Sequence, residues 1–538
     1  MQDSTKMAAV LDVAIVGAGV AGLYAIHKLR GAGFTVQAFE AGGDVGGTWY
    51  WNRYPGCRCD VESLEYSYSF SDDLQQEWRW IERYGTQEQI LAYLNHVAER
   101  FDLRRSITFN TRISSAEFDE ERSCWTLTMA NGETISARYC VMATGNLSTP
   151  RTPDYPGLAD FQRQWYHTGM WPHEGVDFSG QRVAVIGTGS SGVQSIPLIA
   201  RQAAHLTVFQ RTANFILPAR NAATPEAKDR AHKANYPERR EAAYATPFGI
   251  SGYPPPEHCA MEVSAEDREA AYEYKWQNGG QISFLYAYKD LLTDAQANET
   301  AAEFVRNKIR GIVNDPAVAE LLCPTDHPIG AKRLILDSGY FETFNRGNVT
   351  LVDVKTAPIE RFTKTGLSTA QAAYEFDAVV FATGFDAMTG ALREIDIRGP
   401  AGVTLQDKWR DGPRTYLGLM VAGLPNLFMV TGPQSPGVKS NMMLSIEHHV
   451  NVIAATLEHM RERDLCCIAP SEAAETAWVH HNNEVANATL YPQANSWYMG
   501  ANIPGKPRIF MPYVGGVQRY TQTVAERIGN GYEGFEMR

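Results

Sequence analysis

Two unbroken apolar runs, each followed by a glycine-rich turn and a helical stretch, form the clearest pattern in the chain. Residues 13–16 are apolar, Gly17-Ala-Gly19-Val-Ala-Gly22 follows, and LYAIHKLRGAG has the composition of a helix that stops at glycine. A strand, GxGxxG and a helix in that order set a pyrophosphate at a helix N-terminus. The pattern predicts a Rossmann-like dinucleotide-binding unit with Gly17, Gly19 and Gly22 at the cofactor.

The same pattern recurs in RVAVIGTGSSGVQSIPLIA. Gly187, Gly189 and Gly192 stand in the defining places, and Ser190 opens the helix, so we assign all four to a second cofactor. The alternative, that both motifs are ordinary strand turns of a larger fold, is disfavoured because both have the complete strand and helix context.

One residue after each motif distinguishes the two predicted sites. Glu40 closes the strand FTVQAFE, at the spacing where an acid accepts from a ribose hydroxyl and repels a 2'-phosphate, which suits FAD or NAD. The equivalent residue after the second motif is Gln210, followed by Arg211 and Thr212. Because arginine grips phosphate bidentately, the second site is expected to prefer NADPH.

Two Ala-Thr-Gly segments suggest how the chain moves between the nucleotide domains. YCVMATGNLS and AVVFATGFDAM each join a buried strand to such a segment, and we interpret Gly145 and Gly384 as crossover points. The expected fold is α/β, with a first dinucleotide-binding domain of residues 1–145 and 384–538 and a second of residues 146–220 and 331–383.

Residues 221–330 differ in composition from the flanking segments, because they are rich in charged residues and alanine. Val305, Ile309 and Ile312 are four and three residues apart and mark one apolar helical stripe. We therefore expect a helical insertion over 221–330, with its charge runs on a solvated face.

Composition limits the partners. The chain has 538 residues and a formal net charge of -12, so no basic field is available for nucleic acid or an anionic membrane. No stretch reaches the roughly 20 apolar residues that span a bilayer, and the start lacks an export signal, so we expect a cytoplasmic protein. The eight cysteines have no regular spacing, and Cys57 and Cys59 are not the CxxC of a disulfide exchanger. No metal ligands are assigned.

Two longer stretches carry a family resemblance. GGTWYWNRYPGCRCD and FQRQWYHTGMWP resemble the two signatures of the type I Baeyer-Villiger monooxygenases. The matching positions of the first are Gly47, Trp49, Tyr54, Pro55, Gly56 and Asp60, and those of the second are Phe161, His167, Trp171 and Pro172. Arg163 stands where the family has glycine, and arginine would be strained there if the backbone turned through a positive φ.

The resemblance implies FAD in the first domain, NADPH in the second, and insertion of one oxygen atom of dioxygen next to a ketone carbonyl to give an ester or lactone. The reactive species would be a flavin peroxide anion, which needs a fixed positive charge beside it. Arg333 in GAKRL is the candidate because guanidinium stays protonated, and Asp60 would orient it and balance its charge.

The resemblance also implies further site residues. Gly47, Thr48 and Trp49 would lie at the flavin, where the aromatics of the first signature would form a wall that excludes water. Lys332 would join Arg211 and Thr212 at the NADP phosphate, and Trp497 would contact the nicotinamide. The loop GPQSPGVKSNMM would shape the substrate pocket through Ser435, Gly437, Val438, Lys439 and Met442, with Lys439 in place of an apolar residue.

Other interpretations stay open from the residues alone. A flavin monooxygenase that oxidises amine nitrogen or sulfide sulfur is one rival, although Trp171 argues against it, and a non-catalytic NADPH-sensing flavoprotein is another. Asp60 could be a turn carboxylate and Arg333 a surface ion-pair partner. For His167 we favour a role in domain motion over proton transfer. Trp171 and Trp497 could be plain core.

Overall fold

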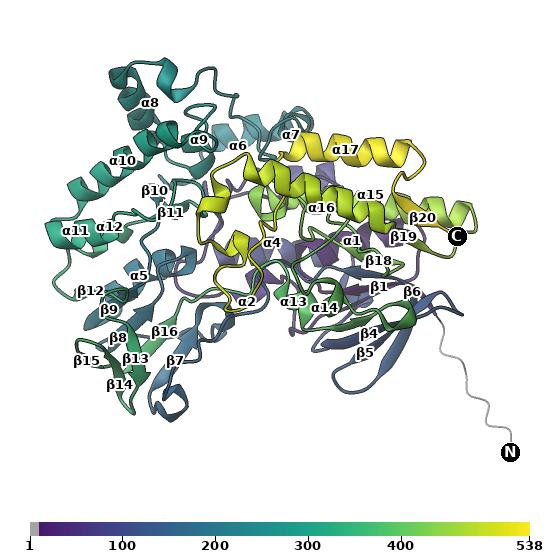
Figure 1. The fold of residues 1–538 in the computed structure, drawn as a ribbon, viewed down its shortest axis with the longest axis horizontal. Helices are drawn as coiled ribbons and strands as arrows, with labels where there is room; N and C mark the ends of the chain where they lie inside the picture. The colour runs from purple at the N-terminus through teal and green to yellow at the C-terminus, as the bar shows by residue number, and fades with distance from the viewer. Residues whose placement is uncertain (1–9) are drawn as a thin grey trace.

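The computed structural model describes residues 10–538 and contains two separate sheets of mainly parallel strands (Figure 1). The expectation that no export signal stands at the start rests largely on residues outside this range. The first sheet has the order β17-β4-β5-β6-β1-β2-β3, with β18 also paired to β6. Its strands are β1 (Leu11–Val16), β2 (Val36–Phe39), β3 (Ile107–Thr108), β4 (Ile113–Asp119), β5 (Cys124–Met129), β6 (Thr134–Met142), β17 (Asp396–Arg398) and β18 (Leu427–Met429).

The second sheet is entirely parallel and has the order β12-β9-β8-β16-β7. These strands are β7 (Gln164–His167), β8 (Arg182–Ile186), β9 (His205–Gln210), β12 (Val349–Asp353) and β16 (Ala378–Phe381). A small antiparallel sheet lies beside it, made of β13 (Ile359–Phe362), β14 (Gly366–Thr369) and β15 (Ala373–Glu375).

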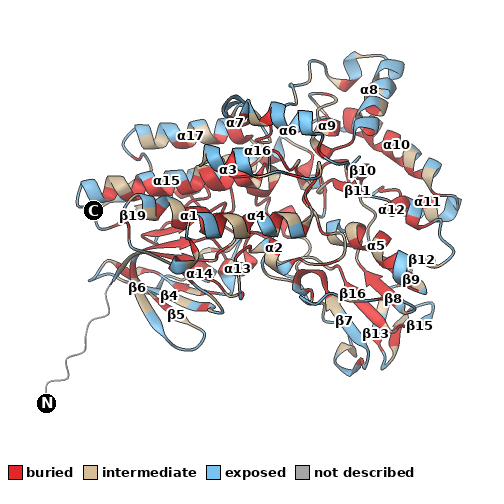
Figure 2. Ribbon diagram, turned by 180° about the vertical axis from the view of Figure 1, so that it is seen from behind, coloured by how far each residue is buried: buried red, intermediate tan, exposed pale blue. Residues whose placement is uncertain are grey.

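The unbroken apolar runs arise because the first strand of each motif is covered on both faces. In β1, Val13 and Ile15 belong to one apolar cluster, whereas Ala14 and Val16 belong to another. In β8, the residues at 183 and 185 face the first of these clusters, and those at 184 and 186 face a third. Figure 2 shows β8 mainly in the buried colour. Alternating side chains thus reach two cores from one strand.

Each glycine motif packs against one of the two Ala-Thr-Gly segments. A Cβ placed on Gly17 would lie 2.6 Å from the carbonyl oxygen of Ala143, and one on Gly187 would lie 2.4 Å from that of Ala382. Both glycines have positive φ, 106° and 111°. Helices α1 (Val20–Gly31) and α5 (Ser190–Gln202) begin directly after these turns. Both predicted Rossmann-like units are confirmed.

The chain changes sheet close to the expected crossover glycines. It leaves the first sheet after β6 and enters the second at β7, and it returns between β16 and β17. Gly145 and Gly384 lie in these connections with φ of 75° and 80°. The domain boundaries at 145, 220, 330 and 383 themselves stay predictions.

The segment 221–330 is helical and lies between β10 (Ile216–Pro218) and β11 (Ile335–Asp337), which pair in parallel. Its helices are α6 (Glu226–Lys233), α7 (Tyr236–Tyr244), α8 (Ala265–Asn278), α9 (Gln281–Leu285), α10 (Ala295–Ile312) and α11 (Pro316–Leu322). In α10, Val305 and Ile309 are buried and Ile312 is half-buried, as the stripe predicts. One of these helices, α7, also packs against the C-terminal part of the chain, because Ala243 contacts Leu444 and Val517.

Most of the remaining helices lie on the side of the first sheet, whereas α12 packs against α5 beside the second sheet (Figure 1). Tyr24 of α1 donates to Asn451 of α15 across 2.7 Å. These helices are α2 (Thr48–Trp51), α3 (Asp72–Glu77), α4 (Gln87–Arg100), α12 (Tyr340–Thr343), α13 (Gly390–Arg393), α14 (Leu405–Lys408), α15 (Met442–Glu462), α16 (Glu472–Asn487) and α17 (Val517–Gly529), and β19 (Ile468–Pro470) pairs with β20 (Phe535–Met537). Within residues 10–538, no helix combines the length and apolar character needed to cross a bilayer.

The close packing of the first motif generates a stability prediction. A Cβ on Gly22 would lie 2.0 Å from the carbonyl oxygen of Gly17, whereas one on Gly31, in the same helix, would meet nothing within 4 Å. We expect Gly22→Ala to lower the free energy of unfolding by roughly 1–3 kcal/mol, because backbone must move. Gly31→Ala should leave it unchanged or raise it by up to about 1 kcal/mol. Urea unfolding of the two purified variants measures this, and equal midpoints would contradict the packing.

Candidate active site

A two-pronged ion pair joins residues far apart in the sequence. Arg333 donates from Nε to Oδ2 of Asp60 across 2.8 Å and from Nη2 to Oδ1 across 2.6 Å, and the two residues are 273 positions apart. The Nη1 group of Arg333 donates to the carbonyl oxygen of Val438 across 2.6 Å. Gln281 of the helical segment donates to the backbone oxygen of Asp60 at 3.2 Å. The guanidinium is therefore held in one orientation by three segments.

The electrostatics keep this guanidinium charged. Burial lowers the pKa of Arg333, but the charge of Asp60 and its hydrogen bonds more than offset that effect and raise the pKa above its ordinary value. The two side chains are 25% and 22% exposed, so the pair is screened from bulk water yet open on one side. A fixed cation with an accessible edge results.

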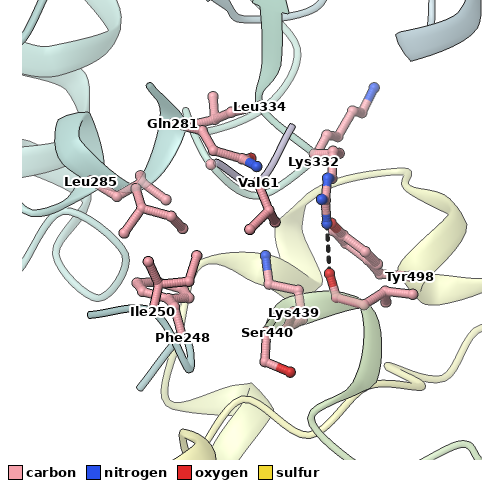
Figure 3. A pocket seen from close by; sticks show the side chains of 14 residues that line it. Val61, Phe248, Ile250, Gln281, Leu285, Lys332, Leu334, Lys439, Ser440 and Tyr498 are labelled. Carbon is pink, nitrogen blue, oxygen red and sulfur yellow. Dashed lines mark hydrogen bonds between the residues drawn. The ribbon is translucent and has the colours of Figure 1, made fainter. Parts of the chain in front are cut away.

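The open side faces a pocket that is partly open to solvent and contains about 440 Å³ of empty space, open solvent included (Figure 3). Its apolar lining comes from Val61 of the first nucleotide domain, from the helical segment, and from residues beside Arg333. The apolar lining residues are Val61, Phe248, Ile250, Ile282, Leu285, Leu334 and Val438, and the polar ones include Gln281, Lys332, Arg333, Lys439, Ser440 and Tyr498. A pocket that combines apolar side chains with fixed polar groups is typical of a small-molecule site.

The predicted pocket loop reaches this cavity only in part. Val438 and Lys439 line it, whereas Ser435, Gly437 and Met442 do not. Ser435 is fully buried and its hydroxyl donates to the Gly432 carbonyl at 2.7 Å. Gly437 lies beside Asn146, and Met442 packs between two apolar clusters. These three residues lie outside this pocket, and their assignment to the substrate site stays a prediction.

The first nucleotide motif offers a cradle without side chains. Gly19 and Gly47 lie back to back, since a Cβ on Gly47 would be 2.9 Å from the Cα of Gly19. The N-terminus of α1 has no side-chain cap, so its first N–H groups are free for a pyrophosphate. Glu40 is buried at the end of β2, where its carboxylate accepts from the backbone N–H groups of Ala18 and Gly42, each at 2.7 Å.

The aromatics of GGTWYWNRYPG diverge instead of forming one wall. Trp49 is buried and its Nε1 donates to Tyr66 at 3.2 Å, whereas Trp51 is 36% exposed. Tyr50 packs edge-on against His173, with ring centroids 4.9 Å apart. The hydroxyl of Tyr54 donates to Gln194 of α5 across 2.8 Å. The short helix α2 turns successive side chains to different sides, and a role for these aromatics in excluding water at the flavin stays a prediction.

The second motif lies beside a group of cations. Arg211 is exposed and makes no hydrogen bond or ion pair within residues 10–538, and the backbone oxygen of Thr212 accepts from Thr188 at 3.0 Å. Burial lowers the pKa of Lys332, as does the charge of Arg211, while Asp326 opposes both. Burial and Arg211 lower the pKa of Arg151 in the same way. Gly189 caps α5 without a side-chain bond. An anion would be stabilised here.

Gln210 does not take part in this cation group. It is buried, and its Nε2 donates to the backbone oxygen of Leu321 at the end of α11 across 2.6 Å. In the sequence Gln210 stands where the first motif has the acid Glu40. In the structure its side chain links β9 to the helical segment, and Arg211, Thr212 and Lys332 stay the candidates for phosphate recognition.

Comparison with known proteins identifies the family. A model described as pyridine nucleotide-disulphide oxidoreductase matches residues 11–235. A Baeyer-Villiger monooxygenase of Pseudooceanicola batsensis is 43% identical, covering 99% of this chain and 97% of that protein. An acetone monooxygenase (methyl acetate-forming) of Gordonia sp. is 42% identical over 98% of this chain and 99% of its own length.

Further relatives include a phenazine N-monooxygenase of Lysobacter antibioticus, 41% identical over 97% of this chain and 96% of that protein. The solved structure of an oxidized steroid monooxygenase bound to NADP is 52% identical, with a TM-score of 0.94, and covers 98% of this chain and 99% of that one. The chain belongs to the Baeyer-Villiger monooxygenase family.

The second Baeyer-Villiger signature contributes three residues in three different surroundings. Phe161 packs edge-on against Phe362 under the second sheet, with centroids 5.5 Å apart. Trp171 is 4% exposed and belongs to the main core. Arg163 is exposed and is not among the residues of positive φ, so arginine is unstrained where the family has glycine.

His167 of this signature is the last residue of β7, at the edge of the second sheet. Its Nδ1 accepts from the N–H of Gly169 at 3.0 Å, so its proton is on Nε2, which faces the Arg151 carbonyl and Thr383, each at 3.2 Å. Both crossover segments of this Baeyer-Villiger enzyme therefore meet at one buried ring. The geometry suits a role in domain motion, which stays a prediction.

Trp497 lies in a short turn, Trp497–Met499, that carries Tyr498 to the cavity. Trp497 itself is half-buried and is not among the lining residues, and its indole centroid is 4.2 Å from the ring of Tyr498. Sequence reasoning missed Tyr498, although it follows Trp497 directly. It also missed Phe248, Gln281 and Leu285, for which the helical segment carried no signal.

The surroundings of His167 predict a pH dependence. Burial lowers its pKa from 6.5 to about 4, against the opposing hydrogen bond to Arg151. Between these two pH values His167 is protonated in the unfolded chain and neutral in the folded one, so the unfolded chain binds more protons. The contribution of His167 to the free energy of unfolding is therefore constant above about pH 6.5 and decreases as the pH falls toward 4.

His167→Gln cannot take up this proton. We expect its free energy of unfolding to vary less steeply with pH than that of the parent protein over this range. The difference in slope should correspond to the uptake of up to about one proton on unfolding. Urea titrations at a series of pH values measure the slope. An identical slope in the two proteins would show that the ring does not titrate as its burial requires.

Proposed function

We propose that the protein inserts one oxygen atom of dioxygen next to the carbonyl of a ketone, giving an ester or lactone, with FAD and NADPH as cofactors. The observation that carries this proposal is the charged edge of Arg333, held by Asp60, at an apolar cavity. Membership of the Baeyer-Villiger monooxygenase family supports it.

The residues present fit both cofactors. The uncapped start of α1, the bare contact of Gly19 with Gly47, and Glu40 would hold FAD. Ser190 and the uncapped start of α5 would hold the NADPH pyrophosphate, with Arg211, Thr212 and Lys332 at the 2'-phosphate. When bound, the flavin reduced by NADPH activates dioxygen for transfer to the substrate.

Arg333 has hydrogen-bonding capacity left for this chemistry. Guanidinium has five N–H donors, and three of them are used by the two oxygens of Asp60 and the carbonyl of Val438. Two remain, beside the hydroxyl of Tyr498, and can donate to an oxygen atom in the cavity. When oxygen adds to the ketone carbon, its carbonyl oxygen becomes an oxyanion, and donors already in position stabilise that charge without reorganisation.

Asp60 acts through Arg333. It fixes the plane of the guanidinium and neutralises its charge while the cavity holds no anion. Removing one partner of a largely desolvated pair leaves the other uncompensated, which costs several kcal/mol. The apolar wall, including Phe248, Ile250 and Leu285, excludes water from the reacting atoms.

Oxidation of an amine nitrogen or sulfide sulfur is the second candidate, favoured by the phenazine N-monooxygenase among the relatives. Neither reaction converts a carbonyl oxygen into an oxyanion, which is the step that a preoriented guanidinium stabilises. We therefore place ketone oxygenation first.

We also infer that the protein works in the cytoplasm, because none of its eight cysteines is paired and burial raises the pKa of Cys57 to about 12, which keeps it a thiol.

Arg333 is expected to be indispensable for product formation. With NADPH, air and cyclohexanone or a linear ketone, the parent protein should form a product one oxygen atom heavier, detected by mass spectrometry. Arg333→Ala should lower the rate of ester formation by roughly 100-fold or more while FAD remains bound. Arg333→Lys should recover only part of the rate, because one ammonium cannot reproduce the fork.

The product formed by the parent protein tests the reaction, and the rate of Arg333→Ala tests the role of the guanidinium. If the parent protein oxygenates no ketone but converts amines or sulfides, the second candidate is correct. If Arg333→Ala forms ester at the parent rate, the role given to the guanidinium is wrong while the reaction stands.

Arg211 is expected to distinguish NADPH from NADH. Arg211→Ala should raise the KM for NADPH roughly tenfold or more, the contribution of hydrogen bonds to a charged group, and leave that for NADH nearly unchanged. Steady-state cofactor oxidation measures both constants. Arg122→Ala, at an exposed arginine in the turn after β4, is the control and should alter neither. Equal increases for both cofactors would contradict the phosphate assignment.

A further inference from the structure

A second cation faces the cavity beside Arg333. Lys439 lies on the short 3-10 turn Gly437–Lys439, directly after the residue whose carbonyl anchors the Arg333 guanidinium. Figure 3 shows its amine pointing from this turn toward Val61 in the chamber, whereas the amine of Lys332 points away. The two cations that face the chamber thus start from neighbouring points on its wall.

The amine of Lys439 has no polar partner in the protein. It makes no hydrogen bond or ion pair with any residue in the described range 10–538. Its contacts are aromatic: the Nζ atom lies 4.2 Å from the ring centroid of Tyr491 and 4.7 Å from that of Tyr498. Two ring faces hold the ammonium in place. They accept none of its three N–H bonds in the way that an oxygen does, so donors remain for a ligand.

The charge balance of the chamber favours an anion. Asp60 is the one carboxylate in contact with Arg333 within residues 10–538, and both of its oxygens are used. No carboxylate is among the lining residues, so nothing in the wall of the chamber balances the charge of a protonated Lys439. Burial and then the charge of Arg333 lower the pKa of Lys439 well below its ordinary value. A bound carboxylate would offset both effects.

We propose that Lys439 selects ketones that carry a carboxylate, with the anionic end at Lys439 and the carbonyl at Arg333. This inference rests on the proposed function and names its substrate class. Because the two cations come from adjacent wall positions, the carbonyl and the carboxylate belong to one compact molecule. The apolar faces of Phe248, Ile250 and Leu285 accept the hydrocarbon between and around them.

The test compares matched acids and esters. Levulinate and longer methyl-keto carboxylates are each paired with their methyl esters, which keep the ketone and remove the charge. We expect the parent protein to have a kcat/KM at least tenfold higher for the acids. Lys439→Met keeps the length of the side chain and removes its charge, so it should lose this preference and favour the esters.

Binding without reaction provides a second measurement. Saturated carboxylates such as hexanoate cannot be oxygenated, and they should compete with a neutral ketone in the parent holoenzyme and compete at least tenfold more weakly in Lys439→Met. Lys364→Met, at an exposed lysine of the small antiparallel sheet, is the matched control and should retain the acid preference and the hexanoate inhibition.

The outcomes are distinct. If the parent protein oxygenates the esters but not the acids, or if Lys439→Met keeps the same acid preference, Lys439 only fills space between the two tyrosines and the inference is wrong. If no ketone of either kind is oxygenated, the proposed function itself fails.

Discussion

The ion pair between Arg333 and Asp60 joins two segments that are 273 positions apart in the sequence. Asp60 belongs to the loop after the first nucleotide motif, Arg333 precedes β11, and Val438 belongs to the C-terminal return. A largely desolvated guanidinium is stable only when its charge and donors are satisfied. The cavity therefore lies where these three segments meet, and its chemistry depends on how they are positioned relative to one another.

The two nucleotide motifs provide the rigid frame for this meeting point. In both, the first glycine packs against the alanine of an Ala-Thr-Gly segment at a distance that leaves no room for a side chain. These segments also carry the chain from one sheet to the other, and His167 bonds to the second of them at Thr383. The elements that hold the cofactor are thus the same elements that set the relative position of the two sheets.

Positive side chains are concentrated at two places, although the chain as a whole is acidic. The chain has a net charge of -12, yet Arg211 and Lys332 lie together beside the second motif, and Arg333 and Lys439 lie together at the cavity. Each concentration of positive charge faces a place where an anionic group is expected. The acidic remainder of the surface does not neutralise them, because screening weakens interactions beyond about 10 Å.

The sequence by itself determined the local elements. The strand, glycine and helix order, the acid at Glu40 and the stripe of α10 depend on near neighbours, whose geometry follows from backbone periodicity and the absence of a Cβ. It also pointed to Arg333 and Asp60, through the resemblance of the stretches that contain them. Only the tertiary structure decided that they touch, that Gln210 turns to Leu321, that the aromatics after Gly47 diverge, and that Ser435 and Met442 miss the cavity. These outcomes depend on contacts between residues up to hundreds of positions apart, and side-chain direction in a turn is set by what packs against it.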